Sequence, residues 1–583
     1  MTPGGSFLLE PVVCRIFSRE QFSEEQREID RMVREFAKEK LFPRKEELAE
    51  LNGELTLELM REVGELGLTA IDIPERYGGL GETKSTSAMV NEALTTGGAA
   101  DWVVTFSAHV GIGTLPIVFF GNDDQKERYL PRLASVELLS AYALTEPDAG
   151  SDAMNIKTSA EPTEDGKAYL LTGTKQYITN GGWAGLFIVF ARIADKGMTA
   201  FIVERDSEGL SIGAEEKKMG IKGSSTVNLM LDNVRVPAEN LLGKPGHGGA
   251  IALNILNIGR FKLGAADLGG SKFCIDQAVQ YALERQQFGQ PIAYFEAIRK
   301  KFAEMVARTY MLDSVIYRTV GLMDARIAAL DVASPEYNAQ VMAALEEYAI
   351  EASICKIFGS ETMFRVSDHG VQIYGGYGFS EDYPLARAFR ATRIDRIFEG
   401  TNEINRMVIY GYLLRKSLME ELSLRDAAAG WTDETPAGDT PMRWEIASLD
   451  VTRRLTIKCV FEAISRYGQD LRNAQVVGED LADLVIGYYA ASSTISRLQR
   501  QEEAGKNGRA HLALARLVVA SYLEDAWRLF FRLRPCLFSD SYAQRFSGVF
   551  EEQLQKLHLP FDPVNEIHIL TDDLFHHGHY RFD

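Results

Sequence analysis

A change of periodicity near residue 141 is the feature that most limits how this chain can fold. Four short runs between residues 141 and 245 are rich in β-branched and aromatic side chains: residues 169–173, 186–191, 199–203 and 226–231. Turn residues such as Asp165 and Gly166 separate the runs. Several short strands at this spacing predict a small β-domain or barrel, because βαβ units would place a helix between successive strands.

Helical patterns lie on both sides of this β-rich stretch. Ser23 precedes Gln26 by three residues, a capping-box spacing that opens a charged helix running towards Glu39. Apolar residues recur three and four apart through residues 250–414, and residues 455–464, 481–498 and 512–533 are amphipathic. Seven acidic residues against two basic ones, with two prolines, mark residues 418–445 as an acidic linker.

We therefore predict a mainly α chain with a central β-domain and an extra C-terminal helical domain. The expected order is an N-terminal helical domain at 1–140, a middle β-domain at 141–245, a helical domain at 246–417, the acidic linker at 418–445 and a helical extension at 446–583. A chain of 583 residues suits this division, because domains average roughly 150 residues.

Charge and cysteine content exclude two classes of protein. The chain has 63 Lys and Arg against 82 Asp and Glu, and a net charge of −19 repels a phosphate backbone, so we expect no nucleic-acid partner. Five scattered cysteines without a CxxC pair argue against a disulfide framework and favour a reducing compartment. The first residues lack a secretory or transit pattern, so we expect a cytoplasmic location, or the mitochondrial matrix in a eukaryote.

Residues 102–121 approach the length and apolarity of a membrane span, since they contain no acid or base except His109. Gly111, Gly113 and Pro116 interrupt the stretch, and no basic flank orients it. A buried core helix is therefore the better interpretation.

Several common catalytic motifs are absent from the sequence. There is no P-loop, no G-x-G-x-x-G that opens a βαβ unit, no G-x-S-x-G and no H-E-x-x-H. The run His576-His577-Gly578-His579 could bind a metal, but a solvated tail is the simpler interpretation, so we predict no metal site.

Two segments of the predicted β-domain have the composition of a phosphate or ring contact. Residues 144–152, Leu-Thr-Glu-Pro-Asp-Ala-Gly-Ser-Asp, form a loop able to present N–H groups and hydroxyls, although an ordinary turn has the same residues. Tyr177 and Thr179 lie two residues apart and so point to the same side of a strand, which suits either a planar ligand or a packed strand.

Two further segments belong to the helical domain. Arg285 lies near a helix end, where a planar guanidinium suits a diphosphate, and residues 372–379 are rich in glycine and aromatics. Glu399 lies within residues 393–404 between the apolar Phe398 and Gly400. Burial there would raise the pKa of this carboxyl, as a general base requires, whereas a lone glutamate is more often a solvated charge.

Together the four segments resemble the acyl-CoA dehydrogenase family, from about residue 23 to residue 414, and most closely its very-long-chain branch, because helices continue past the usual end. The resemblance implies an N-terminal helical bundle, a β-barrel-like domain and a C-terminal helical bundle. It also implies FAD, oxidation of an acyl-CoA to the trans-2-enoyl-CoA in fatty acid β-oxidation, and an electron-transfer flavoprotein as acceptor. A homodimer is implied as well, and we doubt membrane contact because the linker is acidic.

The resemblance also assigns individual residues. Glu399 is expected to remove the α-proton while a hydride leaves the β-carbon for flavin N5, with the N–H of Glu399 at the thioester oxygen. Arg285 and Phe288 are expected to reach FAD across a subunit interface. The FAD contacts are expected at Leu144, Thr145, Gly150, Ser151, Tyr177, Thr179, Arg285, Phe288, Gln372, Gly376, Thr401 and Glu403, and the substrate contacts at Ser151, Asn257, Arg260, Phe398 and Gly400.

The chain departs from many relatives at three positions. It has Tyr177 where Trp is common, Glu296 where Gln is common and Asn257 where shorter-chain relatives have Asp. Because the net charge is negative, local arginines such as Arg260 and Arg285 must decide the binding of the anionic CoA.

Small residues on the apolar stretch, Ser107, Ala108, Gly111 and Gly113, would leave a deep acyl channel and favour a long chain. Three alternatives stay open. An acyl-CoA oxidase would pass electrons to oxygen, a nitroalkane-oxidising relative would carry Asp as its base, and a non-catalytic assembly protein would have no use for the intact Glu399 segment.

Overall fold

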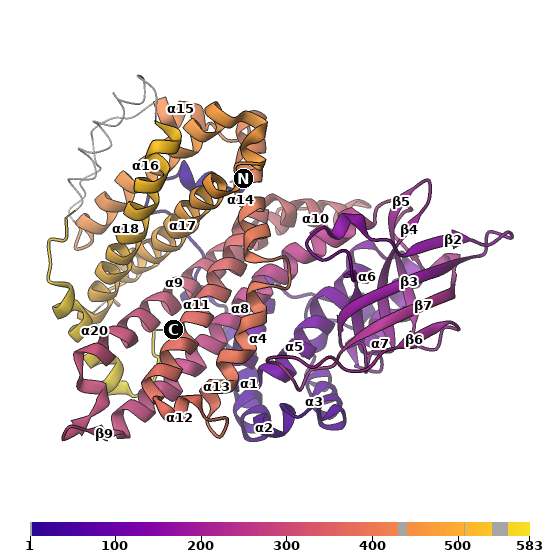
Figure 1. The fold of residues 1–583 in the computed structure, drawn as a ribbon, viewed down its shortest axis with the longest axis horizontal. Coiled ribbons are helices and arrows are strands. Elements are labelled where there is room, and N and C mark those ends of the chain that lie inside the picture. The colour runs from indigo at the N-terminus through magenta and orange to yellow at the C-terminus, as the bar shows by residue number, and fades with distance from the viewer. Residues whose placement is uncertain (1–2, 430–439, 507, 539–557, 583) are drawn as a thin grey trace.

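The computed structural model describes residues 3–429, 440–506, 508–538 and 558–582 (Figure 1). The N-terminal part is helical and contains α1 Glu24–Phe36, α3 Gly53–Glu65, α4 Lys84–Thr95, α5 Ala100–Ala108, α6 Leu115–Phe120 and α7 Asp123–Ala134. Ser23 caps α1 as predicted, because its Oγ accepts from the N–H of Gln26 at 3.1 Å and Gln26 Oε1 accepts from the N–H of Ser23 at 3.0 Å. Every residue of α4 is buried, which makes α4 a core helix.

The stretch that resembled a membrane span is interrupted and mostly inside the fold. Ala100–Phe120 is long and apolar enough to cross a membrane by length and composition, but 72% of its most apolar window is buried within the protein. A π-helical segment at His109–Gly113 separates α5 from α6. His109 is fully buried between Ser140 and the carbonyl of Leu133, at 3.0 Å from each.

The predicted β-domain is confirmed as one eight-stranded sheet on one side of the molecule (Figure 1). The order is β6-β7-β3-β2-β4-β5-β8, and β1 pairs in parallel with β4. The strands are β1 Ser140–Ala143, β2 Ser159–Pro162, β3 Ala168–Thr179, β4 Leu186–Ile193, β5 Gly197–Glu204, β6 Leu210–Ile212, β7 Thr226–Pro237 and β8 Leu241–Leu242. All four predicted runs lie in strands; β4 and β5 are buried on both faces along most of their length.

The chain continues after the sheet with helices that form the centre of the molecule. They are α8 Gly248–Glu284, α9 Glu296–Ile327, α10 Tyr337–Glu347, α11 Ala349–Tyr374, α13 Pro384–Ala391 and α14 Asn402–Leu418. A hairpin of β9 Gln286–Gln287 and β10 Gln290–Pro291 projects between α8 and α9. Glycines allow α8 and α11 to pack closely, because a Cβ at Gly264 would lie 2.6 Å from the carbonyl of Cys355.

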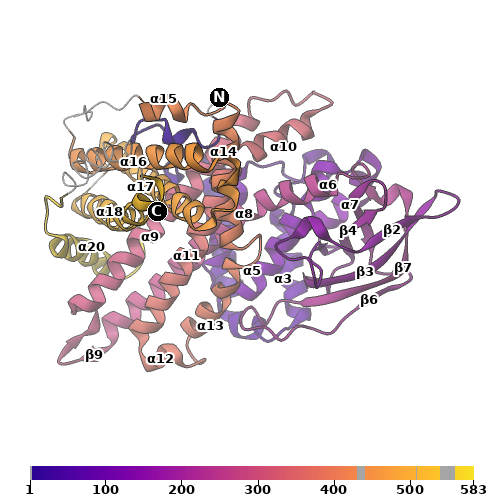
Figure 2. The ribbon, with the colours of Figure 1, turned by 45° about the horizontal axis from the view of Figure 1, so that its top comes forward.

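The C-terminal extension is a second group of helices, α16 Arg443–Tyr467, α17 Gln475–Glu503, α18 Arg509–Leu537 and α20 Pro563–His577 (Figure 2). The three predicted amphipathic segments fall within α16, α17 and α18. Within the predicted linker, Leu424–Ala429 forms the helix α15 and Leu424 is buried, while residues 430–439 lie outside the described residues. All five cysteines are free.

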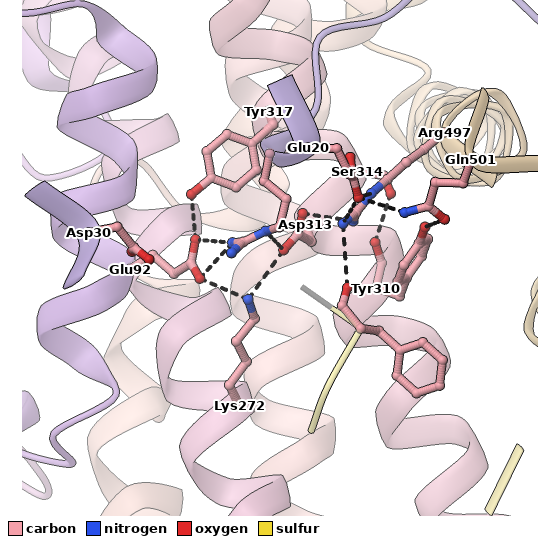
Figure 3. A network of polar contacts seen from close by, with 12 residues as sticks. Glu20, Asp30, Glu92, Lys272, Tyr310, Asp313, Ser314, Tyr317, Arg497 and Gln501 are labelled. Carbon is pink, nitrogen blue, oxygen red and sulfur yellow. Dashed lines mark hydrogen bonds and ion pairs between the residues drawn. The ribbon is translucent and has the colours of Figure 1, made fainter. Parts of the chain in front are cut away.

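Buried ion pairs join this extension to the central helices (Figure 3). Arg497 of α17 donates to Asp313 of α9 at 2.8 Å and to Glu20 of the N-terminal segment. Asp313 also accepts from Arg19 at 2.8 Å, and Lys272 of α8 bridges Asp313 at 3.3 Å and Glu92 of α4 at 2.8 Å. Asp313, Glu92 and Arg497 are fully buried, so charges from both ends of the chain meet in the interior.

Candidate active site

A largely apolar pocket lies between α5, α8, α13 and the turn that precedes α14. Its cavity volume is about 140 Å³, and it extends along α8 from Gly259 to Phe273, about 21 Å at the rise of an α-helix. The apolar lining includes Val103, Val104, Ala108, Ile112, Leu263, Ala266, Phe273, Met363, Ala388, Ile394 and Phe398. This shape and lining suit an extended hydrocarbon chain.

The small residues of α5 and the following π-helical segment contribute to the pocket as predicted, with one exception. Ser107, Ala108 and Gly111 line it. The prediction for Gly113 is wrong, because Gly113 packs against β1, where a Cβ would lie 2.3 Å from Ser140 Oγ. Gly113 follows Gly111 by two residues, and residues two apart on a helix point to nearly opposite faces.

Glu399 lies in the pocket wall on a left-handed turn. Its φ is +56° and that of Gly400 is +80°, and a non-glycine residue adopts this conformation rarely. The carboxylate reaches α8, since a Cβ built on Gly259 would lie 2.5 Å from Glu399 Oε2. Oε2 is shielded from solvent and has no hydrogen-bond partner within the described part of the chain. One oxygen of the carboxyl group is therefore available to a ligand.

Burial raises the pKa of Glu399 to about 7, and the positive charges of Arg260 and Lys356 partly oppose that rise. A carboxyl of this pKa is both substantially ionised near neutral pH and basic enough to take a proton from carbon.

Arg260, predicted as a substrate contact, lies on α8 behind Glu399 and is only 4% exposed. Its Nη1 donates to Asn257 Oδ1 at 2.7 Å, and its Nε lies 3.5 Å from the carbonyl of Glu399. Asn257 is buried as well. Both residues therefore contact the surroundings of the base, and their contact with substrate stays a prediction.

The loop at residues 144–152 and the end of β3, the two predicted segments of the β-domain, lie side by side. The N–H of Gln176 donates to the carbonyl of Thr145 at 2.9 Å, and the buried Lys175 donates to Glu146 at 2.7 Å and to the carbonyl of Leu144 at 3.2 Å. Tyr177 has a φ of +58° and is 60% exposed, and Thr179 lines the pocket together with Glu399. Gly150 and Ser151 are exposed in the same loop as Thr145. An open aromatic ring and hydroxyl groups beside the pocket fit a planar, phosphate-bearing cofactor.

The remaining predicted residues form a second group near the β9–β10 hairpin. Arg285 lies over the ring of Tyr377 at 5.6 Å, Phe288 is 95% exposed, and Gln372 and Gly376 are exposed close by in sequence. Figures 1 and 2 both place this hairpin at the opposite side of the chain from the sheet. One copy of the chain therefore does not bring the two groups together.

Thr401 and Glu403 begin α14 immediately after the base. Thr401 is the N-cap, and its Oγ1 accepts from the N–H of Ile404 at 3.2 Å. Glu403 is exposed in the first turn of the helix, where its pKa is lowered, mainly by a backbone hydrogen bond. Both are held close to Gly400, and their contact with a cofactor stays a prediction.

The sequence did not indicate several polar residues near the pocket. Tyr142 of β1 is buried, and its hydroxyl has no hydrogen-bond partner among the described residues; burial together with the charge of Glu399 raises its pKa. Asp267 and Asp395 line the largely apolar pocket, and burial raises the pKa of both. Lys356 of α11 contacts the turn that carries Glu399. Asp267 and Lys356 could have been found in the sequence, because each is a charged residue within a strongly apolar helical segment.

His576 and His577 are exposed at the end of α20, and His579 is exposed just beyond it. Across the described ranges of the chain, no three His, Cys, Asp or Glu residues are placed to hold a metal ion.

Comparisons with known proteins agree with this geometry. Residues 23–137, 141–234 and 246–414 match the N-terminal, middle and C-terminal domains of acyl-CoA dehydrogenase. The chain is 42% identical over 504 residues to a "Probable acyl-CoA dehydrogenase" of Bacillus subtilis, covering 85% of this chain and 84% of that protein. It is 40% identical over 394 residues to the human "Very long-chain specific acyl-CoA dehydrogenase, mitochondrial", covering 66% of this chain and 56% of that protein.

A solved structure extends the similarity to the whole chain. The acyl-CoA dehydrogenase from Bacillus anthracis, solved in complex with FAD, superposes with a TM-score of 0.95 at 38% identity and covers 100% of both chains. The extension that follows residue 414 is therefore shared with that protein. With three matched domains, an apolar channel and a glutamate in its wall, the chain belongs to the acyl-CoA dehydrogenase family of oxidoreductases.

Proposed function

We propose that this protein is an FAD-dependent dehydrogenase of long-chain fatty acyl-CoA, with Glu399 as the base that removes the α-proton. The carrying observation is the carboxylate of Glu399, which has a pKa of about 7 and one unpartnered oxygen in the wall of a long apolar pocket. The product of α,β-dehydrogenation is the trans-2-enoyl-CoA. FAD, when bound, supplies the acceptor for the hydride that leaves the β-carbon.

The residues of the chain have separate tasks in this reaction. The apolar lining excludes water from the acyl chain, which strengthens every polar interaction at the reacting end. Glu399 Oε2 takes the α-proton, and the backbone N–H of Glu399 is the expected donor to the thioester oxygen as negative charge develops there. Thr145, Ser151, Tyr177 and Thr179 would hold the cofactor beside this pocket.

We propose a homodimer because the predicted FAD contacts form two groups that lie far apart in one copy of the chain. Figure 1 places β9 and the short helix α12, Gly376–Phe379, on the opposite side of the chain from β3, which carries Tyr177. A single FAD contacts both groups when a second copy supplies the hairpin. The high exposure of Phe288 supports this arrangement, because a large apolar side chain on a hairpin tip gains from burial in an interface.

The acceptor that we propose is an electron-transfer flavoprotein. The first experiment tests the reaction and distinguishes a one-electron acceptor from oxygen. The purified protein is expected to show flavin absorbance that bleaches on anaerobic addition of palmitoyl-CoA and recovers on addition of an artificial one-electron acceptor. Absence of bleaching with acyl-CoA of every chain length contradicts dehydrogenation. Rapid formation of peroxide in air, without an added acceptor, indicates an oxidase instead.

Chain-length preference is the second testable consequence. A pocket of about 21 Å along α8, with small residues at Ser107, Ala108 and Gly111, leaves room for a long acyl chain. We expect kcat/KM to peak at long-chain substrates and to fall by about tenfold or more for butyryl-CoA, because each missing methylene forfeits about 0.8 kcal/mol of burial. A turnover profile that peaks at short or medium chains contradicts this assignment.

Gly259→Ala tests the position of the carboxylate. The added methyl group would meet the end of the Glu399 side chain, which can move, so the fold is expected to survive while the carboxylate is displaced. We expect the rate of flavin bleaching to fall by about tenfold or more, since small misplacements of a catalytic group are costly. Gly411→Ala on α14 is the matched control, because a Cβ there meets no atom within 4 Å. Equal bleaching rates in the two variants contradict the placement.

A further inference from the structure

We propose that Lys356, on α11, is a positioning residue for the base: its ammonium group fixes the left-handed turn at Glu399 and Gly400 and supplies a positive charge to the carboxylate. The inference rests on the proposed function only in taking Glu399 as the base. Lys356 is fully buried, 43 residues before Glu399 in sequence, and lies on a different helix.

The contacts of Lys356 are with the turn itself. Its Nζ donates to the carbonyl oxygen of Gly400 at 2.8 Å and to Oδ1 of Asn402, the first residue of α14, at 2.7 Å. One ammonium group on α11 is therefore bonded to the peptide carbonyl of Gly400 and to the side chain of Asn402. A change at Lys356 acts on Glu399 through Gly400, because the bonded carbonyl belongs to the rigid peptide group that follows Gly400.

Other side chains orient this bond network. Asn402 Nδ2 donates to Ser360 Oγ at 3.1 Å and to Glu361 Oε1 at 3.0 Å, which turns its Oδ1 towards Lys356. Ser360 lies one helical turn after Lys356 on the same face of α11. Asn405 Nδ2 also donates to the carbonyl of Gly400, at 2.8 Å. The carbonyl of Gly400 thus accepts from two fixed donors.

Such support is needed because the backbone is strained at the base. A glutamate in the left-handed region is energetically unfavourable and persists only when its surroundings determine it. The bonds from Lys356 and Asn405 are what the structure provides for this purpose. Asn405 Nδ2 also lies 3.4 Å from the carbonyl of Glu399, so the peptide group that follows the base has a donor beside it.

The charge of Lys356 has a second effect, since its two hydrogen bonds within the described chain go to neutral oxygens. Around Glu399 the ionisable groups are Arg260 of α8, Lys356 of α11 and Tyr142 of β1. Around Lys356 they are Asp267, Asp395, Glu399 and Arg260. Burial lowers the pKa of Lys356 to about 8, against the attraction of these carboxyls, so the ammonium form prevails at pH 7.

Removing the positive charge is therefore expected to raise the pKa of Glu399 further. The test compares Lys356→Met, which loses the charge and both bonds, with Lys356→Arg, which keeps the charge but changes the geometry. Lys416→Met is the matched control, because Lys416 is an equally buried lysine on α14 that pairs with Glu347, away from the turn.

The direct readout is an infrared titration of the Glu399 carboxyl band in substrate-free protein, assigned by its loss in Glu399→Gln. We expect Lys356→Met to raise the titration midpoint by about half a unit or more, while Lys356→Arg and Lys416→Met keep it within experimental error. The second readout is the bleaching rate at saturating acyl-CoA and high pH, where Glu399 is ionised in every variant. Lys356 of the wild type is then largely a neutral amine, which still has two N–H groups for its two acceptors, so this readout tests the geometry of the turn and not the charge. Lys356→Met and Lys356→Arg are expected to lose about tenfold or more of that rate, and Lys416→Met to keep it.

The outcomes separate this inference from the proposed function. A Lys356→Met protein with the wild-type midpoint and the wild-type plateau rate overturns the positioning role. If Lys356→Met does not fold, Asn402→Ala replaces it as the test variant, because it keeps the lysine and removes one of its two acceptors. An unchanged plateau rate in Asn402→Ala also overturns the proposal. Failure of the wild type to bleach with any acyl-CoA overturns the proposed function instead, and the infrared titration still tests Lys356.

Discussion

Glu399→Gln is expected to bind FAD and acyl-CoA as the wild type does and to lose flavin reduction by a factor of about 10² to 10⁴ or more. This is the contribution of a positioned general base, and the amide has almost the same shape as the carboxylate but cannot take a proton. The measurement is the rate of bleaching at the flavin bands after anaerobic mixing with palmitoyl-CoA. Binding is followed separately by the shift of the flavin spectrum with a non-reducible acyl-CoA analogue.

The pH dependence provides an internal check on the same assignment. The active form is the carboxylate, and burial raises its pKa to about 7. The wild-type kcat/KM for bleaching should therefore rise with pH through about 7 and level off above it, whereas the residual rate of Glu399→Gln should lack this step. A Glu399→Gln variant that bleaches at the wild-type rate, or a wild type whose rate falls as pH rises through 7, contradicts Glu399 as the base.

Asp313→Ala is expected to lower the free energy of unfolding by about 3–5 kcal/mol, the usual cost of removing one partner from a buried charge network. Asp313 is fully buried and accepts from Arg19, Lys272 and Arg497, so its loss weakens the compensation of three cationic groups at once (Figure 3). Arg497 belongs to α17 of the extension, so the effect should include release of the extension from α9. Urea unfolding followed by circular dichroism measures the change.

The control for Asp313→Ala is Glu58→Ala. Glu58 pairs with Arg44 at 3.4 Å on the surface, and such pairs contribute about 0–1 kcal/mol. If the two variants unfold at the same urea concentration, the buried network does not stabilise the protein beyond a surface pair. A separate early transition in Asp313→Ala would identify the extension as the part that is released.

The sequence predicted the order of domains because periodicity changes with secondary structure, and the structure has strands at all four predicted runs. It did not reveal β1, since Ser140–Ala143 is four residues long and half alanine. The position of Gly113 was mispredicted because it follows Gly111 by only two residues, and residues two apart on a helix point to nearly opposite faces.

The residues of the candidate site were predicted from the family resemblance. The backbone conformation and the contacts that place Glu399 are seen only in the structure. Apolar neighbours suggested that Glu399 is buried, but neither its left-handed backbone nor the approach of its carboxylate to Gly259 follows from the sequence. Lys356 and Arg260 reach the turn from helices that precede it by 43 and 139 residues. Contacts at such separations are set by the packing of α8 against α11, which the pattern of one helix does not encode.

The separation of the β9–β10 hairpin from the sheet has a consequence for how the protein behaves on dilution. In the proposed homodimer, FAD contacts both copies, so cofactor binding and subunit association are linked by mass action. Dilution of the protein should weaken its hold on FAD, and excess FAD should shift the equilibrium from single chains towards pairs. The flavin content of a sample would then depend on the protein concentration at which the sample was last equilibrated. FAD would stabilise the dimer as well as carry out the redox chemistry.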